Sequence, residues 1–138
     1  MKGLLVDSNV ILDLFLDDPV WADWSESVLA DYSASTTLYI NPIVYTEVSV
    51  GFEKIEDLES ALHKGGFQML QIPKEALFLA GKAFVKYRAG RGMKRSPLLP
   101  DFYTGAQAAV LDLDLITRDV SRYRTYFPGI RLICPENI

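Results

Sequence analysis

Four acidic residues lie at or near the junctions between predicted strands and helices. Asp7 follows the apolar run of residues 4–6, and Asp119 closely follows the apolar run 115–116. Glu47 lies one turn inside an expected helix, and Asp101 lies at the start of another. Each has a structural explanation of its own, as a helix cap or a solvated helix residue. Ligand sites of open α/β sheets lie beyond the carboxyl ends of the strands, so together the four acids predict one acidic centre.

Such a centre favours the chemistry of a hard divalent cation. Carboxylates brought close together repel one another unless a cation joins them or some of them are protonated. Magnesium prefers oxygen ligands and keeps several waters, so it needs only a few carboxylates. A bound ion of this kind can polarise a phosphoryl oxygen and generate a hydroxide nucleophile. The only histidine, His63, leaves no basis for a Ser/His/Asp arrangement or a zinc site, and the P-loop motif is absent.

A basic stretch leads towards Asp101. Residues 82–95 contain six Lys and Arg residues and no acid, with Phe84 and Tyr87 among them. Basic residues beside an acidic centre would position a nucleic-acid backbone over it. The alternative is an exposed helix end whose positive charges complement the helix dipole. The candidate substrate-binding residues are Lys82, Lys86, Arg88, Arg91, Lys94 and Arg95.

The elements that must position these residues alternate between strands and helices. Apolar runs predict strands at residues 3–6, 38–40, 67–72, 113–117 and 130–134. Helical spacing and capping residues predict helices at 9–16, 20–32, 53–64, 73–89 and 121–126, with further helices opening at Pro42 and Pro100. This alternation predicts an α/β fold, with a central parallel sheet of about five strands and helices on both faces. We expect one domain over residues 1–138.

Composition narrows the class of protein further. The 138 residues are 49% hydrophobic and 23% charged, which is typical of a globular domain. The net charge is −4, but residues 1–60 hold 12 acids and 2 bases, whereas residues 61–138 hold 6 acids and 12 bases. This asymmetry indicates one acidic and one basic surface. We see no apolar run that could span a bilayer and no signal peptide, so we expect a cytoplasmic protein.

At this point the sequence resembles a known family. Residues 6–9, Val-Asp-Ser-Asn, resemble the opening motif of PIN-domain ribonucleases. Glu47 matches the second acid of that family, and residues 100–106 match the helix that carries the third. Residues 115–119, followed by Tyr123, 126–128 and a final strand, are similar to the end of VapC-type toxins. The likeness covers nearly the whole chain; Ser8 replaces a common threonine, and residues 102–105 replace usual aliphatic positions.

The resemblance implies a PIN-like three-layer α/β/α fold and a Mg²⁺- or Mn²⁺-dependent endoribonuclease, the toxin of a type II toxin–antitoxin pair. It implies Asp7, Glu47, Asp101 and Asp119 as the catalytic acids, with Asp7 and Asp101 as direct metal ligands. Asn9 and Thr117 would orient the carboxylates by hydrogen bonds. Family members commonly form homodimers and are inhibited by an antitoxin peptide that lies across the active-site groove.

Two other interpretations remain open. The same fold could serve as a non-catalytic module that binds RNA or a protein, with the acids acting as helix caps. A weaker alternative is a metal-dependent phosphatase or a receiver-like domain, which also begins with an aspartate after the first strand. An aspartyl phosphatase would want an aspartate where this chain has Asn9, and a receiver would want a lysine where it has Arg118. The identity of the RNA and the number of metal ions are left open.

Overall fold

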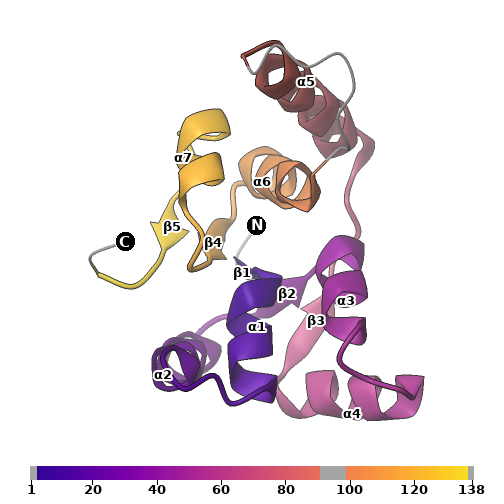
Figure 1. Cartoon of the computed structure of the whole chain (residues 1–138), viewed down its shortest axis with the longest axis vertical. Helices are drawn as coiled ribbons and strands as arrows, with labels where there is room; N and C mark the ends of the chain where they lie inside the picture. Colours follow the sequence, from indigo (N-terminus) through magenta and orange to yellow (C-terminus); the bar gives the residue numbers. More distant parts are fainter. Residues whose placement is uncertain (1–2, 91–98, 137–138) are drawn as a thin grey trace.

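The sheet defines the architecture. The computed structural model describes residues 3–90 and 99–136 of the chain. Within these residues five strands form one parallel sheet in the order β3-β2-β1-β4-β5 (Figure 1). The strand bounds are β1 Leu4–Val6, β2 Leu38–Ile40, β3 Phe67–Met69, β4 Asp114–Ile116 and β5 Leu132–Ile133.

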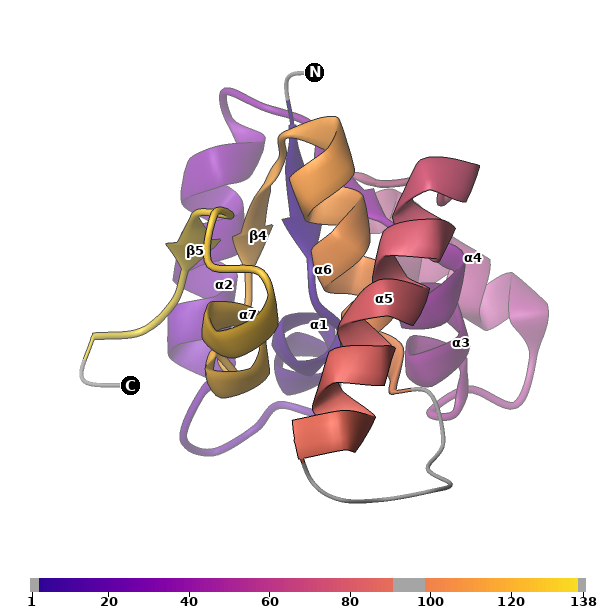
Figure 2. The ribbon, with the colours of Figure 1, turned by 90° about the horizontal axis from the view of Figure 1, so that it is seen from above.

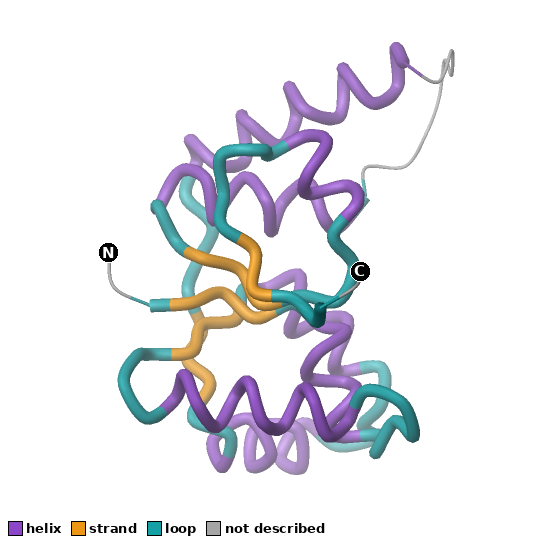
Figure 3. The backbone as a smooth tube through the Cα atoms, turned by 90° about the vertical axis from the view of Figure 1, so that its left-hand side faces the viewer, coloured by secondary structure: helices purple, strands orange, loops and turns teal. Residues whose placement is uncertain are grey.

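Helices cover both faces of this sheet, as Figure 3 shows from the side. Two apolar clusters, one on each face, identify which helices pack where. One face carries α1 Ser8–Phe15, α2 Ala22–Ser33, α3 Pro42–Ser49 and α4 Ile55–Lys64. The other carries α5 Lys74–Gly90, α6 Pro100–Leu111 and α7 Ser121–Tyr126. The predicted three-layer α/β/α fold is confirmed.

The central strand is buried on both sides, which explains its continuous apolar sequence. Leu4 and Val6 belong to the cluster under α1–α4, whereas Leu5 belongs to the cluster under α5–α7. All three side chains are at most 5% exposed. Because β1 pairs with β2 on one side and β4 on the other, it lies at the centre of the sheet.

The chain adds strands on one side of β1 first and on its other side afterwards, so the topology switches between β1 and β4. From β1 the chain first builds outwards to β2 and β3, and the connections run over the α1–α4 face. It then returns to β4 and β5 over the α5–α7 face, which lies in front of the strands in Figure 2. In open α/β sheets such a switch point leaves a crevice at the carboxyl ends of the two strands, where ligands bind. Asp7 and Thr117 directly follow these two strands.

The third layer depends on close approach between α6 and the chain after α7. A Cβ atom added to Gly105 would lie 2.4 Å from a ring carbon of Phe127, so only glycine leaves room for that ring. The small residues of the sequence 105–109 predict close packing of α6 against the sheet. Ala106 and Ala108 are fully buried, as this predicts, but Ala109 is exposed. The small residues therefore hold α6 and α7 together as well as packing α6 on the sheet.

Some predicted details are wrong. The helical spacing of Ile55, Leu58 and Leu62 leaves open whether they face the core or a dimer surface. Leu58 and Leu62 are buried, whereas Ile55 is 63% exposed because it opens α4 at the edge of the layer. Helical spacing predicts Leu77 on the packed side of α5 with Ala76 and Ala80, but it is 45% exposed. The contact with the sheet is made by Ala76, Ala80 and Ala83. Strands β3 and β5 are shorter than the predicted ranges 67–72 and 130–134. No described helix is long and apolar enough to cross a membrane.

Candidate active site at the carboxyl edge of the sheet

Asp7 is the most enclosed acid of the site. It caps α1, is 4% exposed, and its Oδ1 accepts a hydrogen bond from the backbone N–H of Ser8 at 2.9 Å. Its Oδ2 accepts from the hydroxyls of Thr117 at 2.9 Å and Tyr123 at 2.8 Å, and lies 3.4 Å from the Asn9 amide nitrogen. The capping role and the candidate active-site role therefore belong to the same carboxylate.

Burial raises the pKa of Asp7 from its ordinary 3.8 to about 6. This value already includes the neighbouring negative charge of Asp101, which also raises the pKa, and the hydrogen bonds from Tyr123, Thr117 and Ser8, which lower it. Desolvation outweighs these donors because a buried carboxylate loses its hydration shell. The ionised form of Asp7 is therefore destabilised in the folded protein, and a bound cation would stabilise it.

Asp101 meets Asp7 through a shared phenol. The Tyr123 hydroxyl lies 2.8 Å from Oδ2 of Asp7 and 3.3 Å from Oδ1 of Asp101. Since it has one proton, the shorter contact identifies Asp7 as its acceptor. The other oxygen of Asp101 accepts a hydrogen bond from Nη1 of Arg122 at 2.7 Å. The side chain of Tyr123 is fully buried, and burial followed by the charges of both aspartates raises its pKa well above the usual value.

Glu47 approaches the pair from α3. Its Oε1 accepts a hydrogen bond from the Ser8 hydroxyl at 3.0 Å. Partial burial, with a contribution from Asp101, raises the pKa of Glu47, whereas the bond from Ser8 lowers it. Ser8 therefore connects Asp7, through its backbone, to Glu47, through its side chain. Asp7 and Glu47 thus each interact electrostatically with Asp101, and they are linked to each other through Ser8.

The fourth acid sits on a loop whose backbone is closely held. The backbone N–H of Asp119 donates to the Thr117 hydroxyl at 3.1 Å, and the Asn9 amide donates to the same oxygen at 3.2 Å. Thr117 thus accepts two bonds while it donates to Asp7. The Asp119 side chain is exposed and interacts electrostatically with Arg118 and Arg122. Asn9 and Thr117 have the contacts that the orienting role requires.

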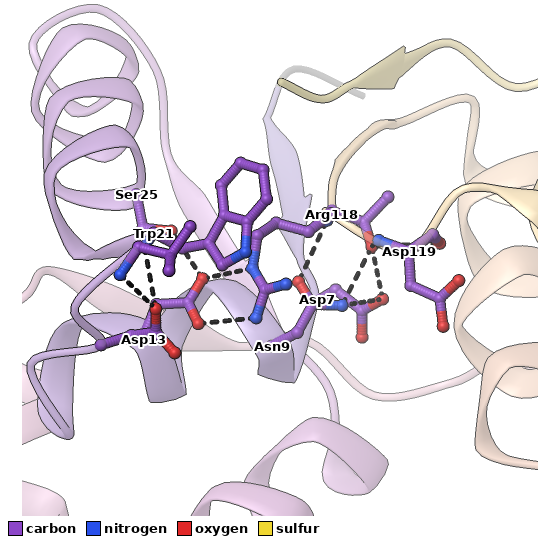
Figure 4. Close-up of polar contacts among 10 residues, drawn as sticks. Asp7, Asn9, Asp13, Trp21, Ser25, Arg118 and Asp119 are labelled. Atoms are coloured by element: carbon purple, nitrogen blue, oxygen red, sulfur yellow. Dashed lines mark hydrogen bonds and ion pairs between the residues drawn. The ribbon is translucent and has the colours of Figure 1, made fainter. Parts of the chain in front are cut away.

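Arg118 fastens this loop to α1 and α2, as Figure 4 shows. Its guanidinium makes two contacts with the buried carboxylate of Asp13, Nε at 2.5 Å and Nη2 at 2.7 Å. Asp13 also accepts from the Ser25 hydroxyl at 3.0 Å, and the guanidinium lies 5.1 Å from the ring centroid of Trp21. The backbone N–H of Arg118 donates to the Asn9 side chain at 3.1 Å.

A buried amide network fixes the two helices that carry Glu47 and Asp101. Asn41 caps α3 through the Val44 N–H at 2.8 Å and donates to Gln107 of α6 at 2.9 Å. The Asn41 amide also lies 3.2 Å from the Thr104 hydroxyl, and Gln107 donates to the carbonyls of residues 70 and 71 at 3.1 Å. Because these polar groups are paired, the distance between α3 and α6 is set by directional bonds.

The predicted basic stretch is described only in part. Lys82, Lys86 and Arg88 lie on α5, where Lys82 lies over the ring of Phe78 and Arg88 over the ring of Phe84. Arg91, Lys94 and Arg95 lie outside the described residues. Contact of this stretch with RNA stays a prediction.

Sequence reasoning missed the roles of Tyr123, Arg122 and the Asp13–Arg118 pair. Tyr123 was noted in the resemblance without a function. One signal was available, since Arg122 and Tyr123 follow Asp119 by three and four residues in a helix that begins at the site. Both residues lie in the first turn of α7, directly after the loop that carries Asp119.

The donor set suits a hard divalent cation. Asp7 and Asp101 offer carboxylate oxygens close enough to contact one hydroxyl, and Glu47 lies beyond Ser8. Among the described residues no three acidic, His or Cys side chains gather closely enough to hold an ion together. Magnesium usually binds one or two carboxylates and completes its shell with water, so the Asp7–Asp101 pair fits it.

The chain matches a known protein family and several solved structures. The PIN domain family profile matches residues 4–128. Among solved structures, the chain is similar to VapBC2 from Rickettsia felis bound to a DNA fragment from their promoter, with a TM-score of 0.70 and 17% identity. The match covers 95% of this chain and 97% of that one. A comparison with curated proteins finds no match.

Two further structures have the same fold. A toxin–antitoxin complex from Klebsiella pneumoniae is 24% identical with a TM-score of 0.67, covering 99% of this chain and 100% of that one. FitAcB from Neisseria gonorrhoeae is 20% identical with a TM-score of 0.63, covering 98% and 99%.

Proposed function

The chain belongs to the PIN-domain family, and on that premise we propose that it is a metal-dependent endoribonuclease and the toxin of a toxin–antitoxin pair. The observation that carries the proposal is the pair of carboxylates, Asp7 and Asp101, that meet at one phenol beside the strand switch point. Two carboxylates held this close destabilise a fold, because each raises the free energy needed to ionise the other. Packing alone therefore does not explain the pair.

In this proposal Asp7 and Asp101 hold Mg²⁺ or Mn²⁺. A bound ion of this kind supplies Lewis acidity towards a phosphoryl oxygen and lowers the pKa of water. Thr117, Tyr123 and Ser8 fix the oxygens of Asp7 in one orientation. Glu47 and Asp119 complete the negative surface on either side, through water or a second ion. The basic side chains on α5 bind the RNA backbone.

The fold likeness supports an antitoxin as the partner. The related structures described above include VapBC2 and a toxin–antitoxin complex, and a cognate antitoxin of this chain would cover the acids and prevent RNA from reaching them. A homodimer is part of the same proposal, and light scattering of the purified protein tests it.

The first experiment measures cleavage of total cellular RNA by the purified protein with Mg²⁺ or Mn²⁺, and again with a chelator. Asp101→Asn is compared with Asp114→Asn, a matched control whose carboxylate pairs with the surface residue Arg131. We expect metal-dependent fragments from the parent protein and from the Asp114 variant, and none from the Asp101 variant. Cleavage that persists in the chelator or in folded Asp101→Asn contradicts the proposal.

Binding of RNA without cleavage, by a folded protein and over several classes of RNA, favours the non-catalytic alternative. Expression in cells separates the two in a second way. The parent protein should arrest growth in the absence of an antitoxin, and Asp101→Asn should not.

A further inference from the structure

Arg122 is a cation that pairs with one acid of the acidic centre. Its Nη1 lies 2.7 Å from Oδ2 of Asp101, and its side chain is 31% exposed. The guanidinium also lies 5.9 Å from the ring centroid of Tyr87 on α5. Asp101 thus already has a positive partner at the place where a divalent cation would bind.

The two arginine pairs of this region are built differently. Arg118 contacts Asp13 through two nitrogens, and Asp13 is 4% exposed and bonded to Ser25 as well. Arg122 makes a single N–H···O contact with an aspartate that is 20% exposed. A bidentate, enclosed pair is geometrically fixed, whereas a single contact near solvent is easily exchanged. The first pair has the form of a structural tie, and the second does not.

Space for a displaced guanidinium lies next to the pair. An open hollow of about 310 Å³ is lined by Tyr87, Gly90, Ser121, Arg122, Thr125 and Tyr126. Arg122 therefore stands between the acidic centre on one side and this hollow on the other. The ring of Tyr87 offers the guanidinium a favourable surface in the hollow as well.

We propose that Arg122 is an internal counter-ion that Asp101 exchanges for the divalent cation, and that the freed guanidinium binds a phosphate of the RNA. This inference rests on the proposed function. Two positive charges cannot both lie close to Oδ2 of Asp101 without repelling each other. Arginine suits the second task, because its planar fork matches phosphate oxygens and keeps its charge. Until the metal arrives, Arg122 would balance the charge of Asp101.

The metal half is tested on RNA-free protein by calorimetric titration with Mn²⁺. Arg122→Gln should bind the ion about fivefold more tightly than the parent protein, since a repulsion worth about 1 kcal/mol is removed. Arg122→Lys keeps the charge and should stay near the parent affinity. Arg131→Gln removes the same charge from the remote pair with Asp114 and should change nothing. Equal or weaker binding by Arg122→Gln overturns the exchange.

The phosphate half is tested by RNA cleavage at saturating metal, with far-ultraviolet circular dichroism confirming that each variant folds. Arg122→Gln should lose roughly 10- to 100-fold in kcat/KM in spite of its tighter metal binding, as expected when a charge-assisted phosphate contact is removed. Arg122→Lys should recover part of the loss. Full activity in Arg122→Gln overturns this half. If no variant cleaves RNA at all, the proposed function fails, while the titration still decides whether Arg122 competes with the ion.

Discussion

Asp7 shows how a single side chain can weaken a fold in order to build a site. Its carboxylate is buried at the end of the central strand, and its pKa is raised to about 6 by burial and by Asp101. In the unfolded chain the same group ionises near 3.8. The folded protein must therefore bear the cost of a buried charge at neutral pH, and a metal ion would relieve that cost.

The consequence for stability has a definite sign. Below about pH 4 Asp7 is protonated in both states and costs nothing. As the pH rises from about 4 to about 6, the unfolded chain releases this proton while the folded protein keeps it. The stability of the metal-free protein therefore falls over that range, by about 3 kcal/mol at most, and levels off above it. Asp7→Asn removes this loss, since the Tyr123 hydroxyl can turn its proton to Asp101 and accept a hydrogen bond from the new amide. We expect the variant to be more stable than the parent at pH 7.5.

Urea unfolding in the presence of a chelator at pH 4, 5.5 and 7.5 measures this difference. The stability gained by Asp7→Asn should be largest at pH 7.5 and should vanish towards pH 4. Taking the difference between the two proteins cancels the titration of other groups, such as Glu47. A gain that is independent of pH, or a loss at every pH, contradicts the raised pKa.

At the scale of elements, the site depends on one loop being held against two helices. The loop after β4 carries Thr117 and Asp119, and Arg118 between them reaches across to Asp13 of α1. Trp21 and Ser25 enclose this pair from the α2 side. The tie crosses the switch point, so it joins the two halves of the sheet where the acids meet.

Asp13→Asn tests this tie. Removing one partner of a largely buried ion pair leaves the guanidinium uncompensated, and we expect a loss of about 3 kcal/mol in the free energy of unfolding. The matched control is Asp114→Asn, whose pair with Arg131 is exposed and should contribute about 0–1 kcal/mol. Equal losses in the two variants would mean that the Asp13–Arg118 pair has no special structural role. Metal-dependent cleavage should also fall in Asp13→Asn, because Thr117 loses its fixed position.

At the scale of the whole molecule, charge is divided between the two parts of the chain. The first 60 residues hold 12 acids and 2 bases, and the remainder holds 6 acids and 12 bases. The described basic residues of the second part include Lys82 and Lys86 on α5, which covers the face opposite α4. If RNA lies along α5, its binding must weaken steeply with salt, because each phosphate contact releases a counter-ion.

The salt dependence of RNA binding by the inactive Asp101→Asn protein tests this surface. Replacing Lys82 and Lys86 by Gln should reduce the slope of log K against log salt by about 1.4, the value for two phosphate contacts on a single strand. The matched control replaces Lys54 and Lys64, which flank α4 on the other face, and should leave the slope unchanged. The same reduction in both variants would mean that the effect is one of net charge alone.

Much of this architecture could be predicted from the sequence. The features that could not be predicted depend on tertiary packing. The alternation of buried strands and helices fixes the layers, and acids at strand ends fall at one edge of a parallel sheet. The partners of Tyr123 and Arg122 could not be predicted, because they depend on how closely α7 docks on α6. That approach is decided by the space that Gly105 leaves for Phe127.

The exposure of Ile55 escaped for a related reason. An apolar residue at the first position of a helix continues the helical spacing of Leu58 and Leu62, yet it projects beyond the edge of the layer that buries them. Spacing gives the side of the helix on which a residue lies, whereas burial depends on what covers that end of it. The expectation of a single domain over residues 1–138 stays a prediction.

The pairing of β1 with β4 also has a consequence for how the protein is made. The carboxylate of Asp7 receives its hydrogen bond from Thr117, 110 positions later in the chain. During synthesis β1 is made long before its neighbour β4. Asp7 and Glu47 are likewise made before Asp101, Thr117 and Tyr123. A nascent chain that stops just before β4 has Asp7, Glu47 and Asp101 but lacks Thr117 and Tyr123, whose hydroxyls hold the Asp7 carboxylate. Competence is acquired late in translation, in the same step that completes the sheet.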